Sequence, residues 1–104
     1  MKRGPGVVAL LERALSNSAG RSGASIAFTD SHATEWHSAT FSGMRHEIAG
    51  GAPTSAALDQ WLAGLREDTL PILGHLVADI AVASVHRAPA RTSFRLEALT
   101  VAES

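Results

Sequence analysis

The chain has 104 residues, of which 45% are hydrophobic and 18% charged, as in an ordinary globular domain rather than a disordered segment. A formal net charge of -1 excludes a global positive field, so we expect neither nucleic acid nor a membrane surface as a partner. The absence of cysteine excludes disulfides and thiolate chemistry and suits a cytoplasmic protein. Residues 1–104 are expected to form a single domain, with 1–5 and 102–104 flexible.

The first third of the chain predicts a helix followed by a hairpin. Apolar residues at helical spacing, with Pro5 near the first turn, predict a helix from about Gly6 to Ser16. Ser25 to Thr29 is typical of a short strand, and Asp30 to His32 of a turn. Thr34 to Ile48 then predicts one long strand, which would be the hairpin partner of the short one.

The next segment predicts a second helix. Gly50 to Pro53 is expected to break the chain, and Thr54 is a plausible N-cap. An apolar stripe at i, i+3, i+4 and i+7 follows and predicts a buried helix face, formed by Leu58, Trp61, Leu62 and Leu65.

The last third predicts two more strands. Leu76 to His86 is rich in Val, Ile and Ala on both faces, which is typical of a central strand covered on both sides. Arg87 to Ala90 indicates a turn, and Arg91 to Val101 a final strand. Its apolar alternation changes face after Ala98, and a β-bulge there is one explanation.

The order of elements predicts an α+β protein. A two-layer sandwich, with a four-stranded antiparallel sheet and both helices on one face, accommodates the order helix, strand, strand, helix, strand, strand. The same order results from moving the first strand of a ferredoxin-like βαββαβ chain to its end, so a permuted ferredoxin-like topology is possible. A more curled sheet around the second helix is the alternative.

One face of the predicted long strand is the candidate interface. Alternation places Ala39 and Phe41 toward the core and the other set toward the outside. A solvated strand face is one reading of that set. We favour an interface, because Trp36 and Met44 are unfavourable in water, and we expect a homodimer through facing sheets. The outward set is Trp36, Ser38, Thr40, Ser42, Met44 and His46, with Arg45 beside it.

The rival hypothesis is a small enzyme or metal-binding domain. It would use His37 or His46 with Arg45 and a carboxylate, because histidine titrates near neutrality and binds metals. The five histidines have no local metal-ligand spacing, and no cofactor motif or nucleophile elbow is present, so no metal, cofactor or catalytic residue is assigned. A protein or small-molecule partner is left unidentified.

Arginines near the strands allow two readings. In one, they converge on a carboxylate or phosphate; in the other, they form cross-strand ion pairs with Glu35, Glu47 and Glu97. We favour ion pairs, because Arg95 and Glu97 lie two apart on one strand face. The arginines concerned are Arg45, Arg87, Arg91 and Arg95.

Overall fold

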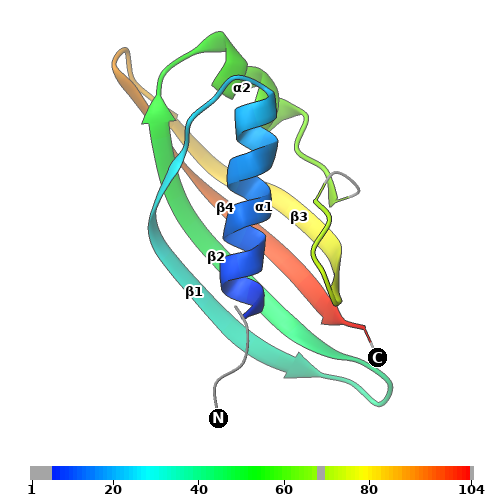
Figure 1. The fold of residues 1–104 in the computed structure, drawn as a ribbon. Helices are drawn as coiled ribbons and strands as arrows, with labels where there is room; N and C mark the ends of the chain where they lie inside the picture. Colours follow the sequence, from blue (N-terminus) through cyan, green and yellow to red (C-terminus); the bar gives the residue numbers. More distant parts are fainter. Residues whose placement is uncertain (1–5, 68–69, 104) are drawn as a thin grey trace.

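The computed structural model describes residues 6–67 and 70–103. The chain folds in the predicted αββαββ order, and its four strands form one antiparallel sheet (Figure 1), which confirms the two-layer α+β class. The elements are α1 (Val7–Arg21), β1 (Ala27–His37), β2 (Ser42–Pro53), α2 (Ala56–Ala63), β3 (His75–Arg87) and β4 (Arg91–Ala102).

The spatial order of the strands is β1-β2-β4-β3. Each hairpin joins sequence neighbours, and the two hairpins meet through β2 and β4 in the middle of the sheet. The last strand of the chain thus lies between β2 and β3, as a permuted ferredoxin-like arrangement requires. The sheet also runs further than expected at its end: Ala102 closes β4, and the Glu103 N–H donates to the Gly74 carbonyl at 3.1 Å.

The first helix is one turn longer than predicted. Residues 17–21, which are small and polar enough to predict a stop, remain helical because Ser18 and Ala19 are buried. The Trp61 indole N–H donates to the Ser18 hydroxyl at 2.9 Å, which gives that hydroxyl a partner inside the protein. Tertiary contacts therefore override the local preference of these residues.

The prediction of a single strand from Thr34 to Ile48 is wrong, as is the predicted turn at Asp30 to His32. Residues 30–37 lie within β1, and the chain reverses at residues 38–41. Ser38 closes this turn: its backbone N–H donates to the Phe41 carbonyl at 2.7 Å, and its hydroxyl accepts from the Phe41 N–H at 3.0 Å. A serine that bonds the backbone of its own turn is a common turn device.

The expected break at Gly50 to Pro53 is also wrong, because β2 continues through it. At Gly50 an added Cβ would lie 2.8 Å from the Ala27 carbonyl oxygen and 3.0 Å from the Phe94 ring, so glycine permits close packing inside the sheet. The second helix is confirmed with Leu58, Trp61 and Leu62 buried, but it ends at Ala63, before Leu65. Its N-cap is Ser55, whose hydroxyl accepts from the Leu58 N–H at 3.0 Å.

The central position predicted for β3 is wrong, because β3 is an edge strand. Its register with β4 shifts between Val77 and Asp79 and again between Val82 and Ser84. Each shift changes which residues face inward, so apolar residues on both faces reflect bulges rather than double coverage. The bulge predicted in β4 is wrong for the same reason: its register with β2 is continuous, and the irregularity lies in β3.

One hydrophobic core lies between the helices and the inward residues of the sheet. Alternate residues of β4 are buried, with Phe94 and Leu96 almost fully enclosed, and Ile48 of β2 lies opposite Leu96. Helix α1 crosses the strands (Figure 1) and contributes Leu11 and Leu15 to this core. From α2, Trp61 contacts the Phe94 ring edge to face, with centroids 6.1 Å apart.

Candidate functional site

The sheet has an exposed face opposite the buried residues of its central strands. Directly paired residues of antiparallel strands point to the same side, so the register defines this face across all strands. On the central strands it carries Arg45, Glu47, Arg95 and Glu97, all of them exposed. Within the described part of the chain, a site on this face is therefore accessible to solvent and to a partner molecule.

One end of this face is apolar. Trp36 of β1 pairs with Gly43 of β2, Gly43 with Val101 of β4, and Val101 with Leu76 of β3, so one row crosses the whole sheet. Phe41, in the hairpin turn, is 59% exposed, and Leu76 is 55% exposed. Leu99 lies in the neighbouring row. We call Trp36, Phe41, Leu76, Leu99 and Val101 the apolar patch.

Gly43 shapes the patch. The indole Nε1 of Trp36 lies 3.0 Å from the position that a Cβ on Gly43 would take, so the ring extends across the glycine. A side chain at Gly43 would also overlap the Thr100 carbonyl oxygen. Glycine is thus required where the indole and the β4 backbone approach β2.

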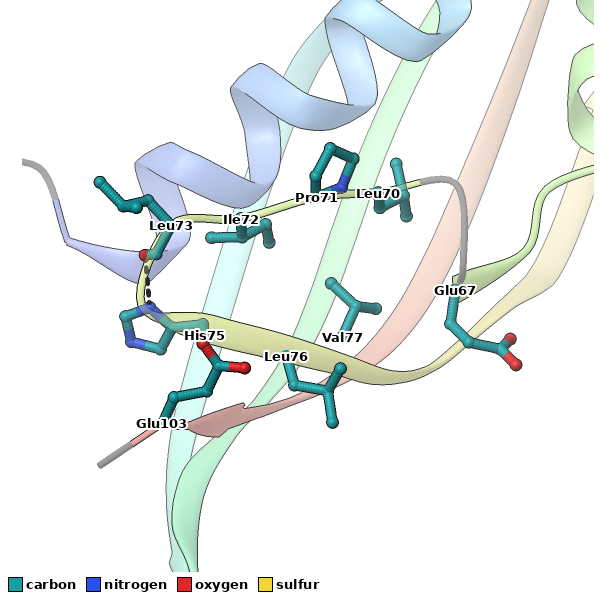
Figure 2. A pocket seen from close by; sticks show the side chains of 9 residues that line it. All are labelled: Glu67, Leu70, Pro71, Ile72, Leu73, His75, Leu76, Val77 and Glu103. Carbon is teal, nitrogen blue, oxygen red and sulfur yellow. Dashed lines mark hydrogen bonds between the residues drawn. The ribbon is translucent and has the colours of Figure 1, made fainter.

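Two hollows border Leu76. One has a volume of about 570 Å³ and is lined by Phe41, Val101 and Glu103, among others. The other, of about 580 Å³, lies between β3 and the segment that precedes it (Figure 2). That segment carries the apolar side chains Leu70, Pro71, Ile72 and Leu73, with Glu67 and Glu103 at the rim. The apolar patch is therefore bordered by concave surface as well as exposed side chains.

The middle of the exposed face is acidic. Glu47 and Glu97 lie directly opposite each other on β2 and β4, and both line a hollow of about 160 Å³ together with Asp79 and Arg45. Within residues 6–67 and 70–103, Arg45, Arg91 and Arg95 form no ion pair with the glutamates predicted as their partners. Arg87 points elsewhere and binds Asp59 of α2, with an Nη2–Oδ2 distance of 3.1 Å.

His46 lies inside the protein. It is fully buried, its Nε2 is 2.9 Å from the Thr100 hydroxyl oxygen, and its Nδ1 has no partner among the described residues. Burial lowers the pKa of His46 from its ordinary 6.5, and the nearby His75 lowers it further. A neutral imidazole in this position supports the core and is closed to substrate.

The predicted outward set is not brought together. Trp36 lies on the exposed face, whereas His46 and, by the same alternation, Met44 lie on the other side of the sheet. Ser38 and Thr40 lie in the turn, and Ser42 begins β2. Phe41, predicted to point into the core, is exposed. The prediction of one continuous outer stripe is wrong, because the turn resets the alternation between Trp36 and Ser42.

The residues of the rival enzyme hypothesis are also separated. His37 is exposed at the hairpin end, with its Nε2 3.7 Å from the Glu35 carboxylate. Arg45 and His46 are strand neighbours on opposite faces. In the described part of the chain, no group of three or more histidines and carboxylates is arranged to hold a metal ion.

Sequence reasoning missed most of the apolar patch. Its signal was present in β4, where Leu99 and Val101 alternate with buried Ala98 and Thr100. Half-buried apolar residues on the open face of a regular strand indicate a binding surface as readily as a bulge. Leu76 and Phe41 carried no comparable signal, because their positions depend on the bulges of β3 and on the turn.

Comparison with protein-family models, curated proteins and solved structures found no match. Among the described residues, no helix combines the length and apolar character needed to cross a bilayer. The functional inference therefore rests on the geometry of this chain itself.

Proposed function

We propose that this protein is a homo-oligomeric binding or assembly module that acts through the apolar patch. The observation that carries the proposal is the row Trp36, Gly43, Val101 and Leu76, which crosses an exposed sheet face with Phe41 beside it. Large apolar side chains gathered on one exposed surface are typical of interfaces rather than of inert surface. A cytoplasmic location, expected from the absence of cysteine, stays a prediction.

The occupant we propose is a second copy of the chain. Consider two copies whose exposed faces meet, related by a two-fold axis that runs between the two sheets, parallel to the strands and level with the gap between β2 and β4. It would bring β1 of one copy over β3 of the other, so that Trp36 meets the partner's Leu76 and Gly43 meets the partner's Val101. A bulky side chain then faces a smaller one, and a glycine faces a valine. Such self-complementarity is what an isologous interface needs.

The acidic middle of the face would confine this contact to one end. The same axis brings Glu47 toward the partner's Glu97, and like charges that face each other in an interface are unfavourable. The patch can associate only if the two sheets diverge beyond it. We therefore expect removal of a carboxylate, Glu97→Gln, to strengthen association, whereas Glu12→Gln on α1 should leave it unchanged.

Light scattering of the purified protein over a range of concentrations tests the proposal. The wild-type mass should approach that of a dimer at about 100 μM, an affinity within reach of a small apolar interface. Leu76→Gln should shift the mass to that of a monomer. Val85→Gln is the control for the same substitution elsewhere on β3: Val85 is 47% exposed and pairs with Phe94, so it lies on the opposite side of the sheet and outside the patch.

A monomeric wild type at every concentration would contradict the assembly proposal. If Leu76→Gln and Val85→Gln dissociated the dimer equally, the apolar patch would not be the cause of association. A urea unfolding curve for each variant separates loss of association from loss of folding, since both positions are exposed and should cost little stability.

A further inference from the structure

A second hollow lies toward the other end of the exposed face. Its volume is about 300 Å³, and its polar lining comes from Thr29, Ser84, His86, Ser93 and Arg95. These side chains offer hydroxyl, imidazole and guanidinium groups, all of which can donate hydrogen bonds to an anion.

The strand register explains why these groups are adjacent. Ser93 lies opposite His86 on β3 and Gly51 on β2, and Arg95 lies opposite Ser84 and Ala49. Neighbouring strands are about 4.8 Å apart, so the polar side chains of β3 and β4 border one small area. Ala49 and Gly51 on the β2 side are too short to fill it.

Arg91 leans toward the same area. It precedes Arg95 by four residues, so the two arginines share a face with Cα atoms about 13 Å apart. The Nε and Nη2 atoms of Arg91 lie 3.3 Å from the position of a Cβ on Gly51, so its guanidinium lies over that glycine. Two long basic side chains thus approach Ser93 from either side along the strand.

The local charge favours an anion. Within residues 6–67 and 70–103, neither Arg91 nor Arg95 forms an ion pair. The nearest carboxylates on this face are Glu97, two residues along β4 from Arg95, and Asp30, which lies opposite Ala49 on β1, two strands away from Arg95. Glu97, with Glu47 opposite it, lies on the side of Arg95 away from Ser93, where the two carboxylates would repel an anion and so hold it toward Ser93 and Arg91.

We propose that this hollow binds a phosphate-type oxyanion, either free phosphate or the phosphate group of a small phosphomonoester. A guanidinium presents paired N–H donors that match such an anion, and hydroxyls at Ser84 and Ser93 supply further donors. The volume suits one phosphate group with a small attachment. The site is independent of the apolar patch, which lies at the opposite end of the face.

Titration of inorganic phosphate into ¹⁵N-labelled protein tests the site, with ionic strength held constant by chloride. The amides of Ser84, His86, Ser93 and Arg95 should shift saturably. Arg95→Gln should weaken phosphate binding by about tenfold or more, because it removes a charge-assisted contact. Arg91→Gln should also weaken it. Arg45→Gln, an arginine on the same face outside the hollow, is the matched control.

Phenyl phosphate in a parallel titration distinguishes the two sources of the group. Tighter binding than inorganic phosphate would support a phosphomonoester ligand, and equal binding would support the free anion. Shifts that chloride reproduces at equal ionic strength would overturn the proposal. So would equal weakening by Arg45→Gln and by both Arg91→Gln and Arg95→Gln.

Discussion

The two faces of the sheet use the same strands in different ways. The inner face is continuous and apolar, with His46, Thr92 and Thr100 as its buried polar members. The exposed face changes character along the strands, from the apolar patch through paired glutamates to the hollow with Arg95. A mainly apolar face that is buried on its central strands supports stability. A divided face that is open to solvent has the variety needed for recognition.

Two leucines three residues apart on β4 give the largest expected contrast between the faces. Leu96 is 1% exposed and belongs to the core, whereas Leu99 belongs to the patch. Leu96→Ala should lower the free energy of unfolding by about 2–5 kcal/mol, because it leaves a cavity. Leu99→Ala should cost less than about 1 kcal/mol. Urea unfolding of both variants measures the difference, and equal losses would contradict the division between faces.

Substitution of Gly43 should show how closely β2 and β4 approach beneath the patch. An added Cβ would overlap the Thr100 carbonyl oxygen, so Gly43→Ala should lower the free energy of unfolding by about 1–3 kcal/mol as the strands shift. Gly20→Ala is the control. Gly20 lies in α1 with nothing within 4 Å of an added Cβ, so that variant should gain about 0.5–1 kcal/mol. A neutral Gly43→Ala variant would show that the approach is not required.

A smaller effect should appear as a pH dependence of the inner face. The folded protein keeps His46 neutral below its ordinary pKa of 6.5, whereas the unfolded chain takes up a proton there. Stability should therefore fall as the pH drops below 6.5, by at most about 1.4 kcal/mol per pH unit. Urea unfolding at about pH 8 and pH 5.5 measures this loss.

Two variants separate His46 from the other histidines. His46→Gln should reduce the loss of stability on acidification, because the buried titrating group is removed. His37→Gln, at a side chain that is 69% exposed, should retain the wild-type loss. The assignment to His46 fails if both variants lose the same stability on acidification as the wild type.

The sequence predicts the architecture well and the faces poorly. The helical spacing of Leu58, Trp61 and Leu62 identifies α2 in the sequence. The order of helices and strands then leaves few possible topologies for the sheet. Side-chain direction depends on register, and moving a turn or adding a bulge reverses it. The turn at residues 38–41 does this for Met44 and His46, and the bulges of β3 do it for the residues taken as signs of a central strand.

The same dependence explains which site residues were predictable. Trp36 lies on the exposed face because it pairs with Gly43, and alternation along a single strand from Thr34 to Ile48 does not give that pairing. The patch as a whole needs the pairing of all four strands. Arg91 and Arg95 share a strand face in the sequence, but their relation to Ser84 and His86 depends on the second bulge of β3.

The bulges of β3 also have a consequence for the outline of the sheet. Both β1 and β3 are edge strands, and a regular edge can accept an additional strand from another polypeptide. The register of β3 is interrupted twice, whereas that of β1 is unbroken from Asp30 to His37. Lateral growth of this sheet, whether in a crystal or in an aggregate, would therefore begin along β1.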